Sequence, residues 1–279
     1  LVAVNLKTGS RVWQLGRVIE HRFPGDPLPP PLPPPLKEEE ADQATSAFHL
    51  CLDAIFLGPP LPLHGKLYVL IEQAGVIRLL CLDPFNLEPV PGRPHIRTPV
   101  LLWSQRLGQP AQTLPDDAVR RFQCCQLAAS DGVIVCPTNS GAVIAVDLMS
   151  HSLLWAYGYG RARRDTPVRP GGGVIIRPGV PPNYNMGLKT DRWHAAVPII
   201  ASGRVLLSAY DSDTLDCLDL RTGRLIWSVP RDVNDLYVGG VINDKVIVVG
   251  RNQVRAYHLF GEDVQQQRHR QLRYRFSFH

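Results

Sequence analysis

The sequence lacks a long apolar segment and a strong excess of one charge. No apolar run reaches the roughly 18 residues of a membrane-spanning helix, so we expect no transmembrane segment in this chain. The net charge of +5 is modest for 279 residues. No aromatic stacking platform accompanies the clustered arginines, and we therefore expect no nucleic-acid partner. The apolar share of 44% is sufficient for a substantial core.

The cysteine and histidine patterns of metal and haem sites are also lacking. The six cysteines form no C-x-x-C pair, no zinc-like spacing with histidine and no C-x-x-C-H motif. The histidines are scattered, with no carboxylate at an informative spacing. We therefore expect no metal site, and the sequence nominates no catalytic residue.

What the sequence does contain is a repeat. Residues 3–13 (AVNLKTGSRVW), 145–155 (AVDLMSHSLLW) and 217–227 (CLDLRTGRLIW) each place an Asn or Asp eight positions before a Trp. A fourth copy is stretched, because it starts at Cys81 and reaches its tryptophan only at Trp103, across a Pro-rich insertion. Recurrence of this kind is the strongest indication of fold in the chain.

Each copy predicts two strands joined by a tight turn. Apolar alternation indicates the first strand, and the Asp or Asn side chain can accept hydrogen bonds from backbone N–H groups just ahead of it. Gly9 and Gly223 then supply the positive φ of a bulged hairpin. The middle copy has Ser150-His151 at this point and should turn less ideally. The tryptophan of each copy is expected to pack against the neighbouring blade.

Further strand patterns precede each copy, giving four strands per unit at intervals of about 40 to 80 residues. We predict an all-β fold: an incomplete β-propeller of four-stranded antiparallel blades, with about four to five blades in residues 1–260. Two insertions are predicted. Residues 24–47, Pro-rich and acidic, should be exposed and disordered, and residues 161–192 should form a long Arg/Pro/Gly-rich loop. We expect the basic tail, residues 261–279, to be disordered.

The repeat resembles that of the pyrroloquinoline-quinone-like (PQQ-like) propeller family. The resemblance is carried by Ala3, Asn5, Thr8, Gly9 and Trp13, and by the matching residues of the copy at 217–227. It covers about two thirds of the chain. The family includes quinoprotein alcohol dehydrogenases, the barrel-assembly lipoprotein of the bacterial outer membrane, and large bacterial multi-repeat propellers without an assigned activity. The motif residues build the blade, so they indicate fold rather than function.

Cys124-Cys125 is the sharpest candidate for a functional site. By the same resemblance, a quinoprotein dehydrogenase would place a ring of two adjacent bonded cysteines against PQQ, together with calcium. The plainer interpretation is two thiols at a strand start, one facing inward and one outward, and we favour it. Trp193 lies outside the repeat and is expected to be an exposed contact.

We predict a non-catalytic propeller that binds or scaffolds a protein partner in the bacterial cell envelope or periplasm, without a cofactor. One alternative is a PQQ-dependent quinoprotein dehydrogenase. Another is a sensor propeller attached to a signalling domain. We expect no signal region within this chain. The sequence opens at Leu1 inside a strand pattern, so we expect the natural N-terminus to lie elsewhere.

Overall fold

The computed structural model describes residues 1–17, 31–117, 120–159, 193, 197–210 and 212–261. Within these residues the chain is built of antiparallel strands, with two short α-helices and one 3-10 turn. The strands form five sheets in this part of the chain, and each sheet uses strands that follow one another in the sequence. The predicted all-β architecture of repeated antiparallel blades is confirmed.

The bounds of the elements follow the chain. Sheet one contains β1 (Val2–Val4) and β2 (Arg11–Gln14). Sheet two contains β3 (Ile55–Phe56), β4 (Leu61–Leu63), β5 (Lys66–Gln73), β6 (Val76–Val90) and β7 (Arg93–Gly108). Sheet three contains β8 (Ala128–Ser130), β9 (Val133–Pro137), β10 (Ala142–Asp147) and β11 (Leu153–Gly158). Sheet four contains β12 (Ile199–Ala201), β13 (Arg204–Leu207), β14 (Thr214–Asp219) and β15 (Leu225–Pro230). Sheet five contains β16 (Asp235–Ile242), β17 (Lys245–Gly250) and β18 (Val254–His258).

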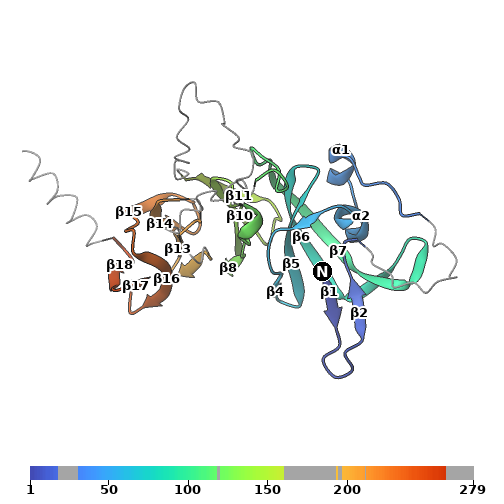
Figure 1. The fold of residues 1–279 in the computed structure, drawn as a ribbon, viewed down its shortest axis with the longest axis horizontal. Helices are drawn as coiled ribbons and strands as arrows, with labels where there is room; N and C mark the ends of the chain where they lie inside the picture. The colour runs from blue at the N-terminus through green and yellow to red at the C-terminus, as the bar shows by residue number, and fades with distance from the viewer. Residues whose placement is uncertain (18–30, 118–119, 160–192, 194–196, 211, 262–279) are drawn as a thin grey trace, which may run out of the picture.

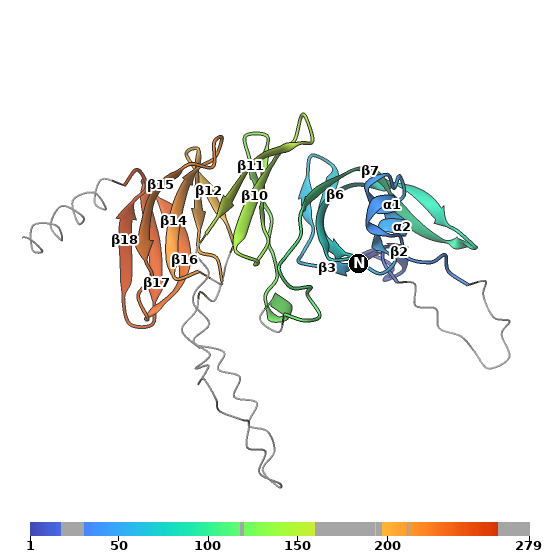
Figure 2. The ribbon, with the colours of Figure 1, turned by 90° about the horizontal axis from the view of Figure 1, so that it is seen from above.

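The sheets succeed one another along the molecule in the order of the sequence, and in the described part of the chain the row does not close into a ring. Figures 1 and 2 show sheet one and sheet five at opposite ends, with sheets three and four between them. Sheets three and four each have four strands in simple sequential order. Among the described residues, each outer sheet of the row therefore has a neighbouring sheet on one face only.

The hairpin that ends each of the first four sheets has the same register. A small residue faces the tryptophan in every case, and the register shifts immediately after that pair. The four pairs are Ala3↔Trp13, Cys81↔Trp103, Ala145↔Trp155 and Cys217↔Trp227. The repeated sequence thus specifies a repeated bulged hairpin.

The turn of this hairpin forms around its Asp or Asn side chain. The Asp147 Oδ1 atom accepts the backbone N–H of Met149 at 2.9 Å and that of Ser150 at 2.8 Å. Asn5 and Asp219 accept the corresponding two N–H groups in their own hairpins. The prediction that this side chain starts the turn is confirmed. The hydrogen bonds from Ser150 and Met149 hold the pKa of Asp147 below its ordinary value.

Asp147→Asn should therefore reduce the dependence of stability on acid pH. Because the folded pKa lies below the unfolded value of 3.8, the carboxylate stabilises the fold above that pH and loses its contribution as pH falls through the folded pKa. Asparagine keeps the acceptor, as Asn5 does in sheet one, but does not titrate. In urea unfolding at pH 7, the wild type should have a larger free energy of unfolding than Asp147→Asn. At pH 3 this difference should be smaller. Asp53, an exposed aspartate outside the hairpins, provides the control. If Asp53→Asn altered the pH dependence of stability as much as Asp147→Asn, the role given to the Asp147 carboxylate would be contradicted.

The stretched repeat is accommodated as a long hairpin. β6 and β7 have 15 and 16 residues and stay paired as far as Val90↔Arg93. Their pairing contains three register irregularities in addition to the one that follows the Cys81↔Trp103 pair. The extra residues therefore extend the strands rather than form a separate loop. Trp103 keeps the pairing of the other copies despite the insertion.

The prediction of a disordered insertion at residues 24–47 is wrong for its second half. Residues Glu38–Asp42 form α1, and α2 (Ala47–Cys51) begins at the last residue of the insertion. Ala41 is fully buried, and α2 buries Phe48 and Leu50. The acidic residues of this segment were predicted to be exposed, but two of the four in α1, Glu38 and Asp42, pair with arginines of sheet two. Arg78 is 1% exposed and donates to Asp42 Oδ1 at 2.5 Å, and Arg106 pairs with Glu38 at 2.6 Å.

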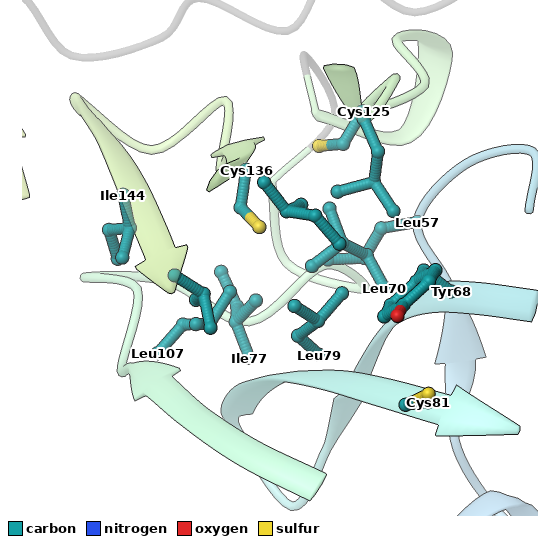
Figure 3. Packing of buried hydrophobic residues seen from close by; sticks show 13 residues of the cluster. Leu57, Tyr68, Leu70, Ile77, Leu79, Cys81, Leu107, Cys125, Cys136 and Ile144 are labelled. Carbon is teal, nitrogen blue, oxygen red and sulfur yellow. The ribbon is translucent and has the colours of Figure 1, made fainter. Parts of the chain in front are cut away.

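A separate apolar cluster fills each junction between neighbouring sheets. Figure 3 shows the junction of sheets two and three, where Ile77 and Leu79 pack toward Cys136 and Ile144. Each sheet thus buries its apolar residues mainly against its neighbours in the row, as repeat proteins do. The predicted loop at residues 161–192 and the tail from residue 262 onward lie outside the described residues.

Candidate functional site

The tryptophans at the ends of sheets three and four each donate a hydrogen bond to the turn or end of the following sheet. The Trp155 Nε1–H donates to the backbone oxygen of Leu220 at 2.8 Å, from sheet three to sheet four. The Trp227 Nε1–H donates in the same way to Leu259, at the end of sheet five, at 2.8 Å. Each indole therefore has a satisfied polar edge and an apolar body packed on the next sheet.

Glycine makes room for the indole in these two turns. A Cβ atom on Gly223 would lie 2.5 Å from Trp155 Cδ2, and one on Gly261 would lie 2.6 Å from Trp227 Cδ1. Both glycines also have positive φ, 66° and 84°. Any side chain at either position would collide with the ring, so the glycine is required for the contact as well as for the turn.

The turn of sheet three differs, as its Ser150-His151 sequence predicts. His151 stands where Gly223 stands in sheet four and has a φ of 57°. Trp103 of sheet two stacks on the His151 imidazole, with 4.6 Å between ring centroids and 20° between planes. The contact between these two sheets is therefore ring on ring, and Trp103 remains partly exposed.

Cys124 and Cys125 lie at the junction of sheets two and three, just before β8. Neither cysteine forms a disulfide bond. Cys124 is exposed, and Cys125 is 3% exposed within the apolar cluster. Their backbone is fixed on both sides. The Cys125 N–H donates to Leu57 O at 2.7 Å, and a Cβ on Gly58 would lie 2.0 Å from Cys125 O. The Asn139 amide donates to Cys124 O at 3.5 Å.

These positions do not fit the quinone arrangement that the family resemblance implies. A disulfide between adjacent cysteines needs both sulfur atoms on one side of the chain, whereas here one thiol faces solvent and the other faces the core. The described ranges also contain no group of three or more His, Cys, Asp or Glu side chains placed to hold a metal ion. The arrangement matches the plainer prediction of one inward and one outward thiol.

A buried ion pair, which the sequence analysis did not identify, holds the segment that carries the cysteines. Arg120 Nη2 lies 2.7 Å from Glu72 Oε2, and both side chains are at most 3% exposed. Glu72 also accepts the N–H of Leu114 at 2.7 Å, and Arg120 donates to Gln112 O at 2.9 Å. The segment that connects sheet two to sheet three is therefore anchored to β5 by this ion pair. No local pattern indicates this pair, since the partners are 48 residues apart.

In addition to the Trp155 hydrogen bond, a polar contact between side chains joins sheets three and four. The Tyr157 hydroxyl donates to Asp216 Oδ2 at 3.1 Å, and the Ser228 hydroxyl donates to Asp216 Oδ1 at 2.6 Å. Asp216 is 3% exposed. Burial, and next the adjacent Asp216 carboxylate, raise the pKa of Tyr157 above its ordinary value. The Tyr157 and Ser228 hydroxyls thus satisfy the hydrogen-bonding capacity of the buried Asp216 carboxylate between the two sheets.

Trp193 is buried rather than an exposed contact, which corrects the expectation from sequence. It is 1% exposed, and its Nε1–H donates to Thr214 O at 3.3 Å. The Arg231 guanidinium lies 5.6 Å from its ring centroid. It packs in the cluster between sheets four and five, so it supports the junction without following the repeat.

The free faces at the two ends of the row expose large apolar side chains. On sheet one, Val2 and Val4 are 55% and 51% exposed, and Leu6 in the turn is fully exposed. On sheet five, Ile242 and Val254 are 65% and 67% exposed. Apolar side chains gathered on one face of a sheet are typical of an interaction surface. The free faces of sheets one and five, here called the end faces, are therefore the candidate functional site.

The comparisons find similarity only at the level of structure. No protein-family model matches the sequence, and no curated protein matches it. Similar solved structures include BamB from Moraxella catarrhalis, with 15% identity and a TM-score of 0.40, covering 74% of this chain and 50% of that one. A europium-containing methanol dehydrogenase has 17% identity and a TM-score of 0.37, covering 70% of this chain and 29% of that one.

The computationally designed Ika4 protein is similar at 10% identity with a TM-score of 0.40, covering 74% of this chain and 92% of that one. The chain thus spans half the length of BamB and less than a third of the methanol dehydrogenase. In the described part of the chain, no helix is long and apolar enough to cross a membrane.

Proposed function

We propose that this chain is a non-catalytic module of a PQQ-like propeller that binds or scaffolds other proteins through its end faces, in a bacterial cell envelope. The exposure of Val4 and Leu6 is the observation that carries the proposal. Their counterparts in sheet four, Leu218 and Leu220, are 0% and 1% exposed because sheet three covers them. The repeat thus presents on sheet one a surface that an inner sheet keeps covered.

The envelope location and the family assignment rest on the blade motif shared by residues 3–13 and 217–227. Sheet five supports the same mode of binding from the other end, through the face that carries Ile242. A partner sheet that covers either end face would remove the exposed valines, leucines and isoleucines from water, and this hydrophobic gain would drive association.

A titration of the protein with PQQ, with and without calcium, tests the non-catalytic part of the proposal. We expect no saturable change in quinone absorbance and no reduction of an electron-accepting dye with alcohol or sugar substrates. Saturable binding with turnover would instead establish the quinoprotein dehydrogenase. In that case Cys124→Ser and Cys125→Ser should each lower the turnover, which provides the internal check.

A further inference from the structure

The proline-rich segment that leads into α1 is anchored to the protein. Residues 31–37 have the sequence PLPPPLK and enter α1 without a helix or strand of their own (Figure 1). Leu32 packs against the apolar cluster formed by α2 and the outer part of the β6–β7 hairpin. Leu36 packs against the cluster of sheets one and two, and its backbone oxygen accepts the Gln73 Nε2–H at 2.8 Å. The segment is therefore held against the surface of the protein.

The residues of this segment restrict its backbone to the polyproline II conformation. Proline fixes its own φ at about −65° and keeps the residue before it in the β or polyproline II region. Four of the seven residues are proline: Pro31, Pro33, Pro34 and Pro35. Lys37, at the end of the segment, has a φ of −71° and a ψ of 165°, close to polyproline II values. The segment is therefore a preformed extended helix with about three residues per turn.

Exposure along the segment follows this turn of three residues. Pro31, Pro34 and Lys37 are exposed, and their spacing places them along one edge of the polyproline II helix. Pro35 is exposed beside this edge. The side chains that face the protein are half-buried: Leu32, Pro33 and Leu36. The segment thus presents to solvent an edge of proline rings that ends in a positive charge. We call Pro31, Pro34, Pro35 and Lys37 the proline ridge.

We infer that the proline ridge is a binding site for a partner protein with an aromatic-lined groove that carries an acidic side chain at one end. Aromatic grooves recognise polyproline II helices by packing their rings against the flat faces of exposed prolines. The ridge is already in the bound conformation and anchored by Leu32 and Leu36, so little conformational entropy is lost on binding. The acidic side chain pairs with Lys37 and fixes the direction in which the ridge lies in the groove.

This site goes beyond the proposed function and is independent of it. The ridge lies beside α1 and sheet two, whereas the end faces belong to sheets one and five. Loss of binding at the ridge would therefore leave binding through the end faces unchanged. A crosslink at Val4 or Val254 likewise says nothing about the ridge, so the two proposals can fail separately.

The test uses the full chain and a purified SH3 domain, a module with an aromatic groove and acidic side chains beside it. Isothermal titration should show binding with a dissociation constant on the order of 100 μM. The same domain with alanine in place of a groove aromatic residue should bind at least tenfold more weakly. A free peptide with the sequence of residues 31–37 is the control for the probe. Binding of the peptide but not of the full chain would show that the ridge is inaccessible and would overturn the inference, as would binding of neither.

Pro34→Ala is the variant that removes one ring of the ridge, and Pro94→Ala is its matched control. Both prolines are exposed, but Pro94 lies on β7 outside the segment. We expect Pro34→Ala to weaken binding of the SH3 domain at least fivefold and Pro94→Ala to leave it unchanged. Equal affinities of the two variants would refute the site, because the contact would then not involve the ridge.

Lys37→Gln tests the charge at the end of the ridge, with Lys245→Gln, an exposed lysine of sheet five, as the control. Lys37→Gln should weaken binding about threefold or more at low salt, and the difference should shrink as salt screens the pair. An equal effect of both lysines would contradict a specific partner for Lys37. Sedimentation checks the remaining occupant: a dimer of the chain that is lost in Pro34→Ala would make a second copy the partner, against the inference.

Discussion

Replacing Trp227 with alanine is expected to lower the free energy of unfolding by about 3–5 kcal/mol. The ring is 4% exposed, packs against Gly261 and lies 6.4 Å, centroid to centroid, from Tyr257. Its loss would open a cavity between sheets four and five and leave the Leu259 oxygen without the indole donor. Urea unfolding followed by circular dichroism measures the change.

Trp103→Ala is the comparison within the same protein. Trp103 occupies the equivalent register but is partly exposed and stacks on His151 instead of a glycine. Its replacement should cost less than that of Trp227, because less apolar surface returns to water. A cost near zero for Trp227→Ala would mean that this ring does not hold the two sheets together.

Arg120→Met is expected to destabilise the protein by about 3–5 kcal/mol, because it leaves the Glu72 carboxylate buried without its cation. The double replacement of Arg120 and Glu72 by methionine should recover most of this loss, since no charge then remains to be buried. Thermal and urea unfolding of the two single variants and the double variant complete the cycle.

An exposed pair provides the control for this cycle. Lys66 and Asp83 lie 3.5 Å apart with side chains 38% and 23% exposed. Lys66→Met should change the free energy of unfolding by about 1 kcal/mol or less, because solvent screens the pair. If Arg120→Met were as mild as Lys66→Met, the segment that carries Cys124 and Cys125 would not depend on the buried pair for its position.

The hairpins could be predicted from sequence because their determinants are local. Asp219, Gly223 and Trp227 lie within nine residues, and each has one physical role: acceptor, positive φ and docking ring. The helix α1 could not be predicted in this way. Its acidic residues would be solvated in isolation, and they fold onto the molecule because Arg78 and Arg106 lie on a sheet more than 30 residues away.

The candidate site was predicted less well than the fold, and the reason is again distance along the chain. The adjacent thiols made Cys124-Cys125 a candidate site in the sequence, but the sequence does not reveal that Gly58 and Asn139 fix their backbone. The end face of sheet one was missed because its sequence is that of any other blade. Val4 is distinguished from Leu218 only by the absence of a covering sheet among the described residues.

Site-specific photo-crosslinking in the native cells tests the central claim, that the protein binds partners through its end faces. A photoreactive residue at Val4 or Val254 would probe the two end faces, and one at Met149, which is 88% exposed in a turn of sheet three, would be the control. Crosslinks to another polypeptide from Val4 and Val254 but not from Met149 are the predicted result. Crosslinking from Met149 alone, or equally from all three positions, would contradict the claim.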